Sequence, residues 1–138
     1  MALDSPVEAV REAQRLLGLT QPAEGTAVRV RRLDKGGADY FLVEVAGHVA
    51  CLDAGTGALM VSAETSRSPL TLTREAAIER SGGGPGARAE LAWAPGRASQ
   101  SMFDPFWVVT ENDRTLYVDQ RGNVWDSLAV KRPGGGAV

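Results

Sequence analysis

The chain has 138 residues, of which 43% are hydrophobic and 23% charged, as in an ordinary globular protein. Its net charge of −2 offers no general attraction to nucleic acid or to an anionic membrane. The single cysteine, Cys51, excludes an internal disulfide, and no apolar run approaches the roughly 20 residues of a membrane-spanning helix. We therefore expect a cytoplasmic protein with no nucleic-acid or membrane partner, or an extracytoplasmic one if a signal peptide has been removed.

The first half of the chain predicts a helix followed by strands. Residues 5–18, SPVEAVREAQRLLG, carry a capping box in Ser5 and Glu8 and a stop signal in Gly18. Arg11, Glu12 and Arg15 are expected on the solvent side of this helix. Short apolar or alternating runs bounded by turn residues then predict strands over 27–33, 40–45, 49–52 and 59–61.

After residues 66–73, SRSPLTLT, the same order of elements begins again. Thr73 can cap a short helix over residues 74–80, and the glycine run SGGGPG ends it. The remaining strands are predicted over 87–94, 106–111 and 115–119, with a closing segment at 120–128. The predicted organisation is a first repeat, a linker, a second repeat and a flexible tail, at residues 1–64, 65–72, 73–130 and 131–138.

Two fourteen-residue segments support this internal repeat. YFLVEVAGHVACLD at 40–53 and FWVVTENDRTLYVD at 106–119 align without a gap and end in Asp53 and Asp119. Any two β-hairpins share part of such a pattern, but here the order of elements, the aspartate and the helix cap also agree. The predicted fold class is α+β, with two helix-plus-antiparallel-sheet repeats packed as one compact domain.

The segments CLDAGTGAL and YVDQRGNVW carry a resemblance to a known family. A short helix, then strands, then an apolar strand ending in Asp-x-x-x-Gly resembles the PepSY family of small bacterial modules. The second copy departs from that pattern, since Gly122 follows Asp119 by three residues rather than four. The resemblance implies an α+β module that binds or inhibits a protein partner such as a peptidase. The same V-D-x-x-G-x-V stretch also resembles small cytoplasmic immunity proteins.

The recurring acidic residues are expected to be structural. Asp53 with Gly57, and Asp119 with Gly122, have the composition of turns in which a carboxylate accepts hydrogen bonds from nearby backbone amides. A calcium site would require more oxygen ligands than DAGTG supplies. We predict structural turns and no metal.

No group of residues predicts catalysis. His48 is the only histidine, and in an extended strand it points away from Cys51, three residues on. GGGPGA at residues 82–87 follows a helix and precedes a strand, the reverse of the order that a dinucleotide-binding loop requires. We therefore expect no enzyme activity and no cofactor.

The apolar residues left over after one sheet face is filled indicate a binding surface. Tyr40, Leu42 and Phe106 are expected on the outer faces of their strands, and Met102 and Phe103 in a long connection. These five residues are the predicted contacts with a protein partner, and the outer sheet face would also allow a homodimer. The hypothesis is a non-catalytic protein-binding module of inhibitory or regulatory type. The alternatives are an immunity protein that neutralises a toxin and a small-ligand-binding protein.

Overall fold

The computed structural model describes residues 2–20, 24–34, 38–96, 98–99 and 101–128. The chain forms two compact units, Met1–Ser68 and Pro69–Val138. Each unit combines one helix with antiparallel strands, which confirms the predicted α+β class. The boundary between the units falls inside the predicted linker, and the predicted tail lies outside the described residues.

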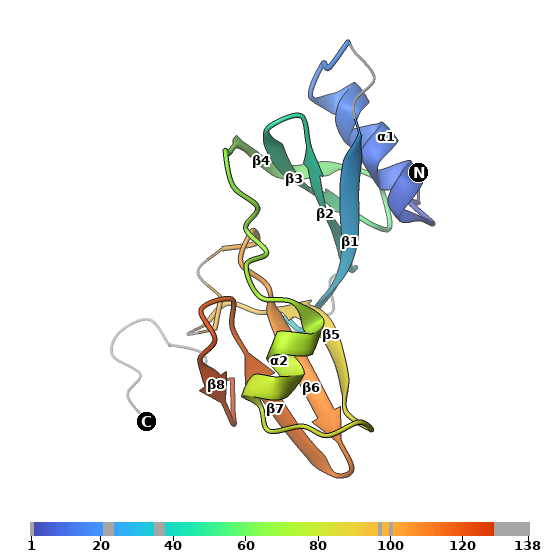
Figure 1. Cartoon of the computed structure of the whole chain (residues 1–138). Coiled ribbons are helices and arrows are strands. Elements are labelled where there is room, and N and C mark those ends of the chain that lie inside the picture. The colour runs from blue at the N-terminus through green and yellow to red at the C-terminus, as the bar shows by residue number, and fades with distance from the viewer. Residues whose placement is uncertain (1, 21–23, 35–37, 97, 100, 129–138) are drawn as a thin grey trace, which may run out of the picture. The chain divides into compact units, whose positions relative to one another are not determined.

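The first unit is a four-stranded antiparallel sheet with one helix packed over its strands β1, β2 and β3 (Figure 1). The strands lie in the order β4-β3-β2-β1. The elements are α1 (Pro6–Leu16), β1 (Gly25–Arg32), β2 (Tyr40–Val45), β3 (His48–Asp53) and β4 (Leu59–Glu64).

Local sequence explains where α1 starts and stops. The Glu8 amide donates to Ser5 Oγ at 3.2 Å, and Glu8 Oε2 accepts from the Asp4 amide at 2.8 Å, so the capping box forms with Asp4 in the reciprocal role. The helix ends at Leu16, and Gly18 follows with a φ of 68°.

The core of the first unit lies between α1 and the sheet. Phe41, Val43 and Leu52 project from β2 and β3 against the small side chains of Ala9 and Ala13. One expectation for the helix is wrong, because Glu12 is buried rather than on the solvent side. Its two carboxylate oxygens accept from the exposed Arg15 guanidinium at 2.6 and 3.0 Å, so the charge of Glu12 is paired.

The second unit repeats this plan with a shorter helix. Its strands lie in the order β5-β6-β7-β8, all antiparallel. The Ala76 amide donates to Thr73 Oγ1 at 3.1 Å, which caps the helix as predicted. The elements are α2 (Arg74–Arg80), β5 (Arg88–Trp93), β6 (Phe106–Glu111), β7 (Arg114–Val118) and β8 (Val124–Trp125).

The central hairpins of the two units have the same register. Phe41 pairs with Leu52 in the first hairpin, and Trp107 pairs with Val118 in the second, each 66 positions further along. Both hairpins turn over two residues, and the first turn residue has a positive φ in each, 48° at Ala46 and 56° at Asn112. Asparagine tolerates this conformation, whereas alanine is strained in it.

Replacing Ala46 by Asn should therefore stabilise the protein. Ala46 is exposed, and Asn-Gly is the preferred pair for a two-residue hairpin turn. We expect the free energy of unfolding to rise by roughly 0.5–1 kcal/mol. Urea denaturation followed by circular dichroism measures this free energy. Ala46→Val is the control and should be destabilised, because it places a β-branched residue at a positive φ. A lower stability for Ala46→Asn would contradict the turn geometry.

Candidate functional site

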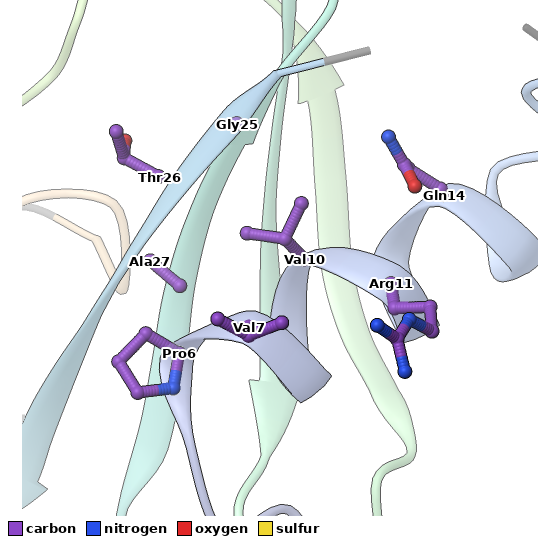
Figure 2. Close-up of a pocket in the computed structure, with 8 residues that line it drawn as sticks. All are labelled: Pro6, Val7, Val10, Arg11, Gln14, Gly25, Thr26 and Ala27. Atoms are coloured by element: carbon purple, nitrogen blue, oxygen red, sulfur yellow. The ribbon is translucent and has the colours of Figure 1, made fainter. Parts of the chain in front are cut away.

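An open groove of about 450 Å³ lies between α1 and the beginning of β1 (Figure 2). Figure 2 shows Val10 pointing from the helix toward the strand, with Arg11 and Gln14 further along the helix. The lining residues are Pro6, Val7, Val10, Arg11, Gln14, Gly25, Thr26 and Ala27.

A glycine allows β1 to approach the helix here. A Cβ atom at Gly25 would lie 2.9 Å from the Glu44 carbonyl oxygen and 3.0 Å from Val10 Cγ1. Both distances are shorter than ordinary van der Waals contacts, so a larger residue would push the strand from its neighbours. Val10 is half-buried and packs on the core, which makes the floor of the groove apolar and firm.

The rim of the groove is both exposed and charged. Val7 is 65% exposed, the most exposed large hydrophobic side chain in the part of the chain that the structure describes. Arg11 is exposed one helical turn further on, and within that same part it forms no ion pair. The groove therefore joins apolar surface to one available positive charge.

The predicted partner contacts occupy different surroundings. Tyr40 and Phe106 are 0% exposed and Leu42 is 1% exposed, whereas Met102 and Phe103 are half-buried. A fully buried side chain offers no surface to a partner, and for Phe106 the cover comes from its own unit. The role of Tyr40 and Leu42 as partner contacts stays a prediction.

Within the second unit, the cause of the burial of Phe106 is visible. The long connection between β5 and β6 folds back on the sheet face away from α2. There Ala94 and Ala98 pack with Phe106, and the Tyr117 ring lies edge-on to Phe106 at 5.9 Å. A loop that the sequence indicates as a binding element thus serves as cover for the sheet.

Hydrogen bonds hold this connection in place. Trp93 Nε1 donates to the Ser101 carbonyl at 2.9 Å, and the Asp104 amide donates to the same oxygen at 2.9 Å. Arg121 pairs with Asp104 at 2.9 Å from the turn that follows β7. Met102 and Phe103 therefore sit in a loop that is anchored on both sides.

The two aspartate turns use the same bonding pattern. Asp53 Oδ1 accepts from the amides of Gly55 and Thr56 at 2.8 and 2.9 Å. Asp119 Oδ1 accepts from the amides of Arg121 and Asn123 at 3.0 and 2.9 Å. Within these turns Gly57 and Gly122 have φ values of 76° and 86°, the left-handed region that glycine tolerates.

The two aspartates differ in burial. Asp53 is half-buried, whereas Asp119 is 0% exposed, and its Oδ2 also accepts from Trp125 Nε1 at 3.0 Å. Burial alone raises the pKa of Asp119, but the hydrogen bonds from Trp125 and Asn123 and the charge of Arg121 outweigh it. The pKa of this carboxyl is therefore lowered from its ordinary value.

Asp119→Asn should destabilise the second unit in a pH-dependent way. The asparagine side chain is neutral and has an NH₂ group in place of one buried carboxylate oxygen. We therefore expect the free energy of unfolding at pH 7 to fall by about 2 kcal/mol, typical of hydrogen bonds to a charged group. Because the folded-state pKa is lowered, the carboxylate contributes stability above its unfolded pKa of about 3.9 and loses it as the pH falls through the folded pKa.

Urea titrations at pH 7 and at about pH 3, followed by tryptophan fluorescence, compare wild type with Asp119→Asn. The stability difference should shrink in acid. Asp53→Asn is the matched control and should cost less, because Asp53 is only half-buried and lacks the indole donor. A difference for Asp119→Asn that stays constant with pH would contradict the role of the ionised carboxylate.

His48 and Cys51 have separate surroundings. His48 Nδ1 lies 3.0 Å from the Ala46 carbonyl oxygen, and Nε2 lies 3.7 Å from Glu64 Oε1 on the neighbouring strand. Cys51 is 0% exposed, and burial raises the pKa of its thiol to about 12. A buried thiol with so high a pKa is a poor nucleophile at neutral pH.

We therefore expect Cys51 to be unreactive in the folded protein. At pH 8 a disulfide reagent such as Ellman's should modify it at least 100-fold more slowly than in urea-unfolded protein, because both access and thiolate formation are suppressed. Absorbance of the released thiolate gives both rates. Fast modification under native conditions would show that the thiol is exposed.

Two polar anchors, the buried Gln120 and the half-buried Glu111, were not predicted from sequence. Gln120 Oε1 accepts from the Leu72 amide and Gln120 Nε2 donates to the Pro105 carbonyl, both at 2.9 Å, which ties the residues before α2 to the sheet. Glu111 Oε2 accepts from the Gly84 amide at 2.9 Å, so the glycine run is a bonded turn between α2 and β5. Isolated polar residues at strand ends carry no sequence signal that distinguishes them from solvent-exposed ones.

Three general findings bear on the class of protein. No cluster of three His, Cys, Asp or Glu side chains suited to a metal ion occurs among the described residues. Neither described helix is long and apolar enough to cross a bilayer. No family model, curated protein or solved structure matches the chain.

Proposed function

We propose that this chain is a non-catalytic protein-binding module of inhibitory or regulatory type, with the α1–β1 groove as its contact site. The observation that carries the proposal is the 65% exposure of Val7 beside a groove of about 450 Å³ with an apolar floor. Exposed apolar surface next to a concave site is typical of binding surfaces, since it carries a cost in solubility.

The groove also defines the chemistry of the partner. Pro6, Val7 and Val10 on one side and Ala27 on the other accept an aliphatic or aromatic side chain. Arg11 accepts a carboxylate placed close to that side chain, and arginine next to apolar surface is a frequent hot spot of interfaces. The partner segment would therefore present a large apolar residue with an acidic residue nearby.

The internal repeat supports a binding role. Both units have the same order of helix and strands, the same hairpin register and aspartate turns of the same pattern, so we infer that one PepSY-like unit was duplicated and that its matching residues maintain the scaffold. The groove residues belong to α1 and β1 of the first unit. Functional divergence between copies would place the contact site on residues that the second copy does not share.

Site-specific photo-crosslinking can identify the partner. A photoreactive phenylalanine at position 7 should capture one protein from an extract of the native host, and the same group at position 124 should not. Val124 is the matched control because it is also an exposed valine, 42% exposed, and belongs to the second unit. Mass spectrometry identifies the captured protein and the segment joined to position 7.

Val7→Ser and Arg11→Glu should then weaken binding to the purified partner without unfolding the protein. We expect a loss of about 10-fold or more for each, because one removes the exposed apolar contact and the other replaces attraction by repulsion. Isothermal titration calorimetry gives the affinities, with Val124→Ser as the control of unchanged affinity. Equal affinities for wild type and both groove variants would reject the groove as the contact site.

A small ligand with an apolar part and a carboxylate is the second candidate, favoured by the size of the groove. A volume of about 450 Å³ lies within the range of small-molecule sites, roughly 300–1,000 Å³. Thermal-shift screening against carboxylate-bearing metabolites tests it, since a ligand of this groove should raise the melting temperature of wild type and not of Arg11→Glu. The absence of any Arg11-dependent shift would exclude this candidate.

A further inference from the structure

The edge strand β4 is exposed and has little of the usual protection against pairing with another chain. Among the described residues it is the terminal strand of the first unit's sheet and pairs with β3 alone. Five of its six residues are exposed, including Leu59 and Val61 at 37% each. Edge strands are usually blocked by lysine, proline, bulges or inward-pointing charges, and in LMVSAE these are limited to the terminal Glu64 and an irregularity between Leu59 and Val61.

The hairpin before β4 determines which backbone groups point outward. Val45 and His48 flank the two-residue turn and form a hydrogen-bonded pair. The backbone N–H and C=O groups of His48 therefore point toward β2, and those of Val49 point toward β4. The partners of Val49 and Cys51 are Ala63 and Val61, whose amides are therefore used by β3. The Thr65 amide donates to the Gly47 carbonyl at 2.9 Å, so the backbone groups of every second residue, Val61, Ala63 and Thr65, point toward β3.

It follows that the amide and carbonyl groups of Ser62 and Glu64 point away from the sheet. The register of β4 is regular from Val61 to Glu64, and its irregularity lies opposite Cys51 and Leu52, before this segment. Ser62 and Glu64 thus present a short, straight row of backbone donors and acceptors. Such a row is satisfied by an added antiparallel strand.

We propose that β4 pairs in antiparallel fashion with β4 of a second copy of this chain, about a two-fold axis at Ser62. In this register the two Ser62 residues exchange both backbone hydrogen bonds, and Val61 of one copy lies opposite Ala63 of the other. The two Glu64 charges are at opposite ends of the ribbon, each beside the start of the irregular part of the other copy's strand. The strand is therefore complementary to itself, as a two-fold interface requires.

The charge of Glu64 decides between the two possible orientations. A parallel, in-register pair would place the two Glu64 carboxylates side by side, and like charges directly opposite each other destabilise a strand pair. The antiparallel register removes this repulsion and brings apolar side chains together on one face. A second copy therefore fits this edge in antiparallel rather than parallel orientation.

Cysteine crosslinking tests this register in the full chain. Residues in a hydrogen-bonded antiparallel pair have Cα atoms about 5.5 Å apart, within the range of about 4.4–6.8 Å that a disulfide spans. Ser62→Cys should therefore form a disulfide-linked dimer under mild oxidation. Ala63→Cys is the matched control, because it is equally exposed but lies roughly 8 Å from its symmetry mate in this register.

The native Cys51 does not interfere, since it is buried and its thiol has a pKa of about 12. We expect the crosslinked dimer of Ser62→Cys to form at least 10-fold faster than that of Ala63→Cys, as measured by non-reducing electrophoresis over time. Equal rates for the two variants, or faster crosslinking of Ala63→Cys, would overturn the proposed register.

Sedimentation equilibrium tests the dimer without crosslinks. An interface of this size is weak, below about 1,200 Å², so the wild type is measured from roughly 10 µM to 1 mM and should dimerise within that range. Ser62→Lys places two positive charges opposite each other and should remain monomeric with an unchanged circular dichroism spectrum. Val7→Ser should dimerise like wild type, which separates this interface from the groove. A wild type that stays monomeric throughout, or a Ser62→Lys variant that still dimerises, would overturn the proposal.

Discussion

The packing of α1 against one face of the first unit's sheet is the interaction on which both proposed surfaces depend. The helix presents Ala9 and Ala13 to Phe41, Val43 and Leu52, so small residues on the helix face large ones on the strands. Burying these apolar groups is the main source of stability for such a unit. Because α1 packs over β1, β2 and β3, its exposed flank forms the groove with β1, while β4 extends the sheet as an exposed edge.

Hydrogen-bonded aspartate turns complete this scaffold in both units, but with unequal burial. The common element is a carboxylate oxygen that accepts two backbone amides within the turn. In the second unit the Trp125 indole adds a third donor and excludes water, so the same residue type becomes a buried anchor. The turn thus sets the same backbone geometry in both units, and the side chains packed around it decide the local energetics.

The two surfaces would recognise different features of their partners. The groove offers apolar side chains and one guanidinium, so it would select side-chain chemistry. The β4 edge offers backbone groups, which every sequence shares, and its selectivity would come from the positions of Val61, Ala63 and Glu64. His48 contacts the Ala46 carbonyl oxygen and Glu64, whereas the Cys51 thiol is buried and its pKa is raised to about 12.

The amino-acid sequence by itself determined the local elements, because their signals are local. Caps at Ser5 and Thr73, apolar alternation and turn residues placed both helices and the central hairpins close to their observed bounds. Tertiary structure alone decided burial, since that depends on which distant segment covers a given face. Phe106 was expected at a surface but is covered by residues of a loop, and Val7 was read only as part of a helix but borders a groove that needs β1. Alternation along a strand shows which residues share a face, whereas exposure of that face depends on what packs against it.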